Sequence, residues 1–115
     1  MSQAVTVVEE QLTAYNARDL ARFVATYASD VEVYRPPAAE PVIRGADALA
    51  DFYGARRFCH PGLRAEILNR LSAGNLVSDH ERVHGLPGGP IEIFATYEVV
   101  DDRIRRVWIF SPAGS

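Results

Sequence analysis

The sequence contains no lysine, and all 12 of its basic side chains are arginines. Enzymes that form a Schiff base through lysine, attach pyridoxal phosphate or hold a phosphate through a lysine are therefore excluded. Cys59 is the single cysteine, so the chain cannot form an internal disulfide and has no paired-cysteine metal motif. This cysteine usage fits a reducing compartment, and we expect a cytoplasmic protein.

Long apolar runs and an excess of positive charge are also lacking. The N-terminus has no basic leader and no apolar stretch near the roughly 20 residues that span a bilayer, so we expect no membrane association. The net charge of -3 predicts no general attraction to nucleic acid. What remains, 48% hydrophobic and 23% charged residues in 115 positions, is typical of one globular domain occupying residues 1–115.

The first half of the chain has the periodicity of helices. Apolar residues recur at helical spacing over 5–15 and again over 20–27. A glycine followed by an apolar stripe predicts a third helix over about 45–56. Between them, 31–34 alternates like a short strand, and the prolines in 35–41 indicate a loop.

The second half reads as four strands separated by turn residues. The segments are 63–71, 76–84, 91–100 and 103–110. Consecutive long hairpins predict an antiparallel meander. Helices segregated from strands predict an α+β fold in which a curved antiparallel sheet covers three N-terminal helices.

Segments 15–20, 27–33 and 48–53, together with Gly45 and this layout, carry a resemblance to a known family. The chain resembles the nuclear transport factor 2-like superfamily, and within it the ketosteroid isomerase and polyketide cyclase branch. The resemblance implies a cone in which the bent sheet wraps the helices around a deep, mostly apolar pocket. It further implies a homodimer formed through the outer face of the sheet. We expect a small-molecule ligand and no cofactor.

The resemblance also implies where an isomerase keeps its catalytic groups: a tyrosine on the first helix, a carboxylate base after the first strand and an aspartic acid on a later strand. These positions correspond to Gln11, Arg35 and Ala95. A guanidinium does not act as a base at ordinary pH. We therefore expect no ketosteroid isomerisation, while an isomerase, cyclase or dehydratase reaction by other residues stays open.

Residues 80–84 match the H-E-x-x-H pattern of zinc proteases. That pattern binds zinc on a helix, where His80 and His84 share a face. On a strand the two histidines stand roughly 13 Å apart, because each residue advances the chain by about 3.3 Å. The turns near Gly74 and Gly85 leave too few residues for a long helix, so we predict no metal site.

Alternation along the strands, aligned through the resemblance, predicts which side chains face the pocket. They are Ser78, His80, Arg82 and His84; then Ile91, Ile93, Ala95, Tyr97 and Val99; then Ile104, Arg106, Trp108 and Phe110. His80 is the candidate catalytic acid or base. The candidate ligand-binding residues are Arg35, Tyr15, Tyr34, Tyr53, Arg106 and Trp108. Structural alternatives stay open: His80 as a hydrogen-bonded core residue, Arg35 as a solvated loop residue, and Arg106 in an ion pair.

Two classes of function follow. One is an enzyme that binds or converts a small, mostly apolar molecule, with His80 as acid or base and Arg35 on a carbonyl, enolate or carboxylate oxygen. The other is a non-catalytic ligand-binding or dimerisation module. For the homodimer, the sequence assigns an apolar set to the outer face: Val77, Val83, Phe94, Val107 and Ile109.

Overall fold

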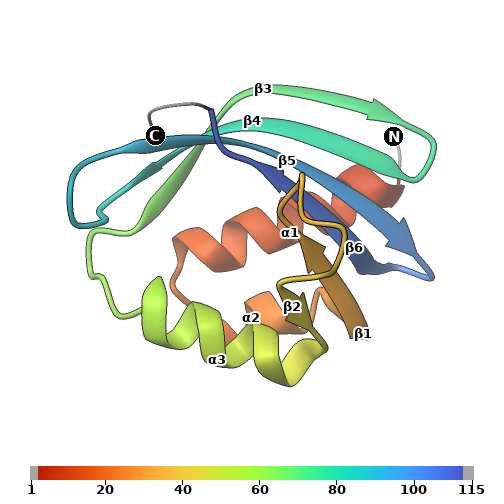
Figure 1. The fold of residues 1–115 in the computed structure, drawn as a ribbon, viewed down its shortest axis with the longest axis horizontal. Helices are drawn as coiled ribbons and strands as arrows, with labels where there is room; N and C mark the ends of the chain where they lie inside the picture. The colour runs from red at the N-terminus through yellow and green to blue at the C-terminus, as the bar shows by residue number, and fades with distance from the viewer. Residues whose placement is uncertain (1–2, 113–115) are drawn as a thin grey trace.

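Three helices and two strands come first and four long strands follow in the computed structural model, which describes residues 3–112 (Figure 1). The helices are α1 (Gln3–Asn16), α2 (Leu20–Val24) and α3 (Ala46–Arg56). The strands are β1 (Tyr27–Tyr34), β2 (Ile43–Arg44), β3 (Arg64–Ala73), β4 (Leu76–His84), β5 (Ile91–Val100) and β6 (Arg103–Phe110). Within these residues, no helix has the length and apolar character needed to cross a membrane.

The buried stripe of α1 determines how this helix faces the sheet. Val8, Gln11 and Tyr15 recur every three or four residues and are buried. At the end of the helix, the Asn16 side chain accepts a hydrogen bond from the Ala65 backbone N–H at 2.7 Å and donates one to its carbonyl at 3.1 Å. These two bonds fix α1 beneath β3.

The strands form one sheet in the order β2-β1-β6-β5-β4-β3. The segment from β3 to β6 is an antiparallel meander, β1 lies parallel to β6, and β2 pairs antiparallel with β1 at the edge. The sheet arches over the helices (Figure 1). Helix α1 contacts β3 to β6, and α3 contacts β1 and β2. The interior therefore lies between the concave face of the sheet and the helices.

The predicted α+β cone is confirmed, and the meander strands begin and end close to their predicted residues. The second helix is shorter than predicted: it ends at Val24, and Tyr27 begins β1. Thr26 donates its hydroxyl to the Phe23 carbonyl at 2.7 Å, which competes with continuation of the helix. The short strand β2 and the parallel pairing of β1 with β6 were not predicted.

The side chains of β4 face the opposite way from the prediction. Val77 lies opposite Tyr97 and Glu81 opposite Ile93, and directly paired residues point to the same face. Since the odd-numbered residues of β5 face inward as predicted, those of β4 do so too. The inward set is Val77, Asp79, Glu81 and Val83, and the set predicted to face the pocket, Ser78, His80, Arg82 and His84, lies on the outer face.

A bulge changes the facing of side chains within β6. The register of β5 and β6 shifts between the pair of Val99 with Ile104 and the pair of Glu98 with Arg106, which leaves Arg105 as the extra residue. An extra residue on one strand moves the following side chains to the other face. Ile104, Val107 and Ile109 are therefore buried. Three side chains predicted to face inward instead face outward: Arg106, Trp108 and Phe110.

The apolar set assigned to the outer face is also corrected. Val77, Val83, Val107 and Ile109 are buried in the interior, and of the five assigned residues Phe94 is exposed, at 47%. The homodimer itself stays a prediction, with a different set of exposed side chains to support it.

Candidate functional site

The concave face of the sheet and the helices enclose a cavity of about 80 Å³. Its aliphatic lining includes Val33, Val83, Ile91, Ile93, Val107 and Ile109, and its polar lining includes Gln11, Tyr15, Tyr27, Arg35, Tyr53, Arg57, Glu81 and Tyr97. For comparison, an engineered apolar cavity of about 150 Å³ binds benzene. The space therefore suits a molecule of few non-hydrogen atoms.

Among the described residues that line this cavity, Glu81 is the only carboxylic acid. Glu81 is 7% exposed, and the Tyr97 hydroxyl donates a hydrogen bond to its Oε2 at 3.0 Å. Burial raises the pKa of Glu81 from 4.5 to about 7, the negative charge of Asp79 adds to the increase, and the bond from Tyr97 opposes it. At neutral pH the Glu81 carboxyl is thus present in both protonation states.

Asp79, two residues earlier on β4, has a different environment. It is 2% exposed, and Arg70 of β3 binds its two carboxylate oxygens at 2.6 and 2.9 Å. Arg70 also contacts Glu9 of α1 at 3.3 Å, which ties this helix to the sheet. The charge of Asp79 is therefore paired with a guanidinium, whereas Glu81 receives a hydrogen bond from a neutral hydroxyl.

Four tyrosines line the cavity: Tyr15, Tyr27, Tyr53 and Tyr97. Burial raises the pKa of each hydroxyl, so all four stay protonated at neutral pH and act as hydrogen-bond donors. The Tyr27 hydroxyl accepts a hydrogen bond from Gln11 Nε2 at 3.2 Å. The rings of Tyr15 and Tyr53 meet edge-on, with centroids 6.3 Å apart. Four neutral hydroxyl groups thus line the cavity together with one titratable acid.

Two half-buried arginines complete the polar lining. Arg35 directly follows β1, and Arg57 directly follows α3, where its backbone N–H bonds to the Tyr53 carbonyl at 3.0 Å. The Arg57 guanidinium also lies 5.7 Å from the ring centre of Phe52. Positive charge from Arg57, and to a smaller extent from Arg35, opposes the effect of burial on the Tyr53 pKa. Both arginines line the cavity together with Tyr53.

The structure brings only part of the predicted site together. Arg35, Tyr15 and Tyr53 line the cavity, and their part in ligand binding stays a prediction. The prediction that His80 faces the cavity is wrong, because β4 presents its even-numbered residues to the outer face. There, His80 Nε2 lies 2.7 Å from a Glu92 oxygen.

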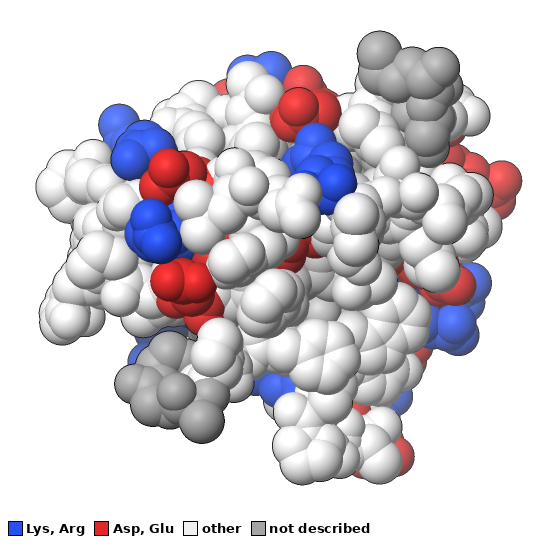
Figure 2. Space-filling view, turned by 90° about the horizontal axis from the view of Figure 1, so that it is seen from above, with Lys and Arg blue, Asp and Glu red and all other residues white. Residues whose placement is uncertain are grey.

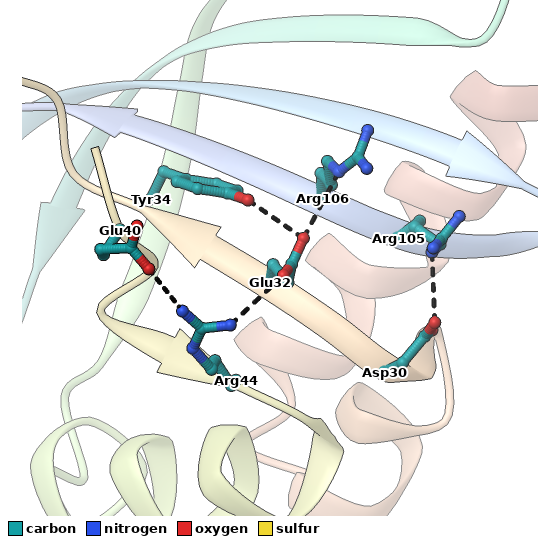
Figure 3. A network of polar contacts seen from close by, with 7 residues as sticks. All are labelled: Asp30, Glu32, Tyr34, Glu40, Arg44, Arg105 and Arg106. Atoms are coloured by element: carbon teal, nitrogen blue, oxygen red, sulfur yellow. Dashed lines mark hydrogen bonds and ion pairs between the residues drawn. The ribbon is translucent and has the colours of Figure 1, made fainter. Parts of the chain in front are cut away.

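Tyr34, Arg106 and Trp108 also lie on the outer face rather than in the cavity. Figure 3 shows Tyr34 and Arg106 converging on Glu32, at 3.0 and 3.5 Å from its Oε1. Arg106 also contacts Glu98 at 3.4 Å, so the ion-pair alternative for Arg106 is the one observed. The Tyr34 ring stacks on Trp108 with centroids 6.0 Å apart. These three side chains stabilise the contact of β1 with β6.

The outer face carries charges of both signs next to one another, as Figure 2 shows from the side of the sheet. Arg82 lies 3.3 Å from Glu92 and 3.9 Å from Glu66. His80 and His84 each contact a different glutamate, Glu92 and Glu66 respectively. Across residues 3–112, no group of three or more His, Cys, Asp or Glu side chains is arranged to hold a metal ion.

Sequence reasoning missed Glu81, Tyr97 as its hydrogen-bond donor, and Arg57. The sequence does contain a signal for Glu81. Val77 and Val83, the two valines of β4, are odd-numbered like Glu81 and therefore lie on the same face of the strand, and their apolar character favours that face for the interior. Tyr97 lies four residues along β5 from Ile93, the residue paired with Glu81, so the hydrogen bond depends on the reach of the two side chains and the strand pairing alone does not predict it. Arg57 follows a helix, and no pattern in the sequence predicts which way it turns.

A curved sheet that closes over helices is the architecture of the nuclear transport factor 2-like class. Residues 8–107 match the SnoaL-like domain family, and the chain belongs to this family. Comparison with curated protein sequences gives no significant match.

Solved structures support the same fold. A candidate ketosteroid isomerase of Kribbella flavida DSM 17836 has a TM-score of 0.82 at 23% identity, over 98% of this chain and 80% of that one. A candidate polyketide cyclase of Sinorhizobium meliloti has a TM-score of 0.76 at 24% sequence identity, over 90% of this chain and 93% of that one. The Δ5-3-ketosteroid isomerase of Mycobacterium sp. has a TM-score of 0.82 at 19% sequence identity, over 97% of this chain and 95% of that one. At these identities the similarity shows the fold and leaves the chemistry to the residues of this cavity.

Proposed function

We propose that the protein is an enzyme that moves a proton at a carbon next to a carbonyl group in a small, mostly apolar molecule, with Glu81 as the acid and base. The observation that carries this proposal is the Glu81 carboxyl itself, which is buried, lines the cavity and has a pKa near 7. A group whose pKa lies near the working pH accepts and returns protons with the least cost.

The proposed step balances within the cavity. The Glu81 carboxylate takes a proton from the carbon next to the carbonyl, and the C–H electron pair moves to form an enolate. The enolate oxygen accepts a hydrogen bond from Tyr15 or Tyr53, both of which stay protonated at neutral pH. Glu81 then returns the proton to a carbon of the enolate, and the C–H bond that forms restores a neutral product.

The substrate we propose is smaller than a steroid. The cavity of about 80 Å³ has no room for four fused rings. The positions at which the family resemblance implies isomerase catalysts hold Gln11, Arg35 and Ala95, and all three line the cavity. We therefore propose a proton transfer that uses Glu81 in place of those groups.

The proposal is tested by hydrogen exchange on a small ketone. Unaltered protein in D₂O is expected to speed the incorporation of deuterium next to the carbonyl of 2-pentanone, measured by NMR. Glu81→Gln should reduce this catalysed exchange at least a hundredfold, in keeping with the usual contribution of general acid–base catalysis of about 10² to 10⁴. The matched control is Glu92→Gln, a glutamate on the outer face of the neighbouring strand, which should exchange like the unaltered protein.

The competing function is a non-catalytic ligand-binding module that uses the same cavity. It predicts saturable binding of 2-pentanone without faster exchange. Exchange at the rate of buffer alone, or equal rates for Glu81→Gln and the unaltered protein, would contradict the enzymatic proposal.

A further inference from the structure

The arginines that line the cavity differ from most other arginines of the chain in their partners. Arg22, Arg44, Arg70, Arg82, Arg105 and Arg106 each form an ion pair with a carboxylate. Over residues 3–112, neither Arg35 nor Arg57 lies within ion-pair distance of a carboxylate. Two half-buried guanidinium groups thus line one small cavity without an acidic side chain of the described chain to pair with.

Arg35 and Arg57 line the same cavity. Tyr53 lines it with them, and each arginine also borders a more open depression: Arg35 one that Val42 and Ile43 line, and Arg57 one that includes the segment following α3. Phe52 lines both depressions. Guanidinium and phenol groups together present several N–H and O–H donors and no negative charge. This is the donor set that a carboxylate accepts best, since its two oxygens match the forked N–H groups of arginine.

The acid that lines the same cavity favours one orientation of such a ligand. Glu81 carries a negative charge when it acts as a base, so it repels an anion placed beside it. An anionic group in the cavity therefore lies at Arg35 and Arg57. An uncharged carbonyl group on the same molecule is then free to approach Glu81 and its hydroxyl neighbours.

We propose that the substrate is a short-chain keto acid, whose carboxylate binds between Arg35 and Arg57 and whose ketone lies toward Glu81. This inference rests on the proposed function, since it names the substrate class of that reaction. The cavity of about 80 Å³ admits only part of such a molecule, so the chain must be short and its carboxylate would extend toward the more open depressions that Arg35 and Arg57 border.

The test compares two probes that differ in charge: 4-oxopentanoate and its neutral amide, 4-oxopentanamide. NMR titration of the unaltered protein at neutral pH is expected to show saturable binding of 4-oxopentanoate that is at least tenfold tighter than that of the amide. Arg35→Gln and Arg57→Gln should each weaken the acid about tenfold, the loss of one charge-assisted hydrogen bond, and change the amide less than twofold. The matched control for Arg57→Gln is Arg56→Gln, the exposed preceding residue of α3, which should leave both affinities unchanged.

The outcomes separate this inference from the proposed function. Equal affinity for the two probes, no saturable binding of 4-oxopentanoate, or equal losses of acid and amide in both arginine variants would overturn the keto acid assignment. Glu81→Gln is expected to bind 4-oxopentanoate at least as tightly as the unaltered protein while losing deuterium exchange. Arginine-dependent binding without exchange would contradict the reaction, and exchange on 2-pentanone without arginine-dependent binding would contradict the substrate class.

Discussion

Replacing Glu81 with glutamine is expected to raise the free energy of unfolding at alkaline pH and to leave it almost unchanged in acid. In the folded protein the pKa of Glu81 is about 7, above its ordinary value of 4.5. Below that ordinary value the folded and unfolded chains both hold the proton, so the carboxyl costs nothing. As the pH rises, the unfolded chain releases the proton first, and stability falls until the folded carboxyl has ionised as well.

The size of the effect follows from the two pKa values. One pKa unit corresponds to about 1.36 kcal/mol, so the difference amounts to about 3 kcal/mol once both states are ionised. Glutamine carries no titrating proton and keeps a carbonyl oxygen that accepts the hydrogen bond of Tyr97. The variant should therefore gain about 3 kcal/mol relative to the unaltered protein above about pH 8, and little at about pH 4.

The measurement is urea unfolding of both proteins across this pH range at one protein concentration. The quantity of interest is the difference between the two free energies of unfolding, since contributions of other groups cancel in it. Glu92→Gln serves as the control of opposite sign, because hydrogen bonds from His80 and Arg82 lower the pKa of Glu92. A difference for Glu81→Gln that stays constant from acid to alkaline pH would refute the buried, high-pKa carboxyl.

Three further predictions concern assembly, specificity and the fold. The outer face exposes Phe94 and Phe110 among charges of both signs, a surface that suits pairing with a second copy of the chain. We therefore expect a homodimer that Phe94→Glu converts to monomers. Sedimentation that shows the unaltered protein as a monomer at micromolar concentration would contradict this. A β,γ-unsaturated ketosteroid should isomerise no faster with the protein than in buffer. In denaturation experiments, Gly85→Ala should lower the free energy of unfolding by about 2 kcal/mol or more, because the new Cβ would lie 2.2 Å from the Gly62 carbonyl oxygen. Gly88→Ala, which has open space around it, should lower the free energy of unfolding by about 1 kcal/mol.

The fold was predictable because its signals are local. Helical spacing, alternating strands and turn residues each lie within a short segment, and they agree with one another along the whole described chain. The strand β2 is only two residues long, and its pairing with β1 depends on a loop that returns through residues 35–42. The parallel contact of β1 with β6 joins residues more than 70 positions apart, and no short-range pattern encodes it.

The site was less predictable, because it depends on the face to which each strand turns its side chains. Because the predicted facing of β4 was off by one residue, His80 was expected in the cavity where the structure has Glu81. The bulge in β6 likewise turns Val107 inward, where Trp108 was expected. Arg35 was placed correctly through the family resemblance, since it directly follows a strand whose end the sequence defines well. The inward face of a strand is thus hardest to predict where both of its faces carry polar residues.

The two inward carboxylates of β4 separate a structural role from a chemical one. Asp79 is held by two bonds from Arg70, and this pair joins β3, β4 and α1, so its removal would leave a buried charge unpaired. Glu81 has no cation within ion-pair distance among residues 3–112, and its raised pKa means that it lowers the stability of the fold at neutral pH. A glutamine at this position would keep the hydrogen bond from Tyr97 without that cost. A buried acid that the packing does not require, and that lines a cavity beside protonated tyrosines, is therefore better explained by proton transfer than by stability.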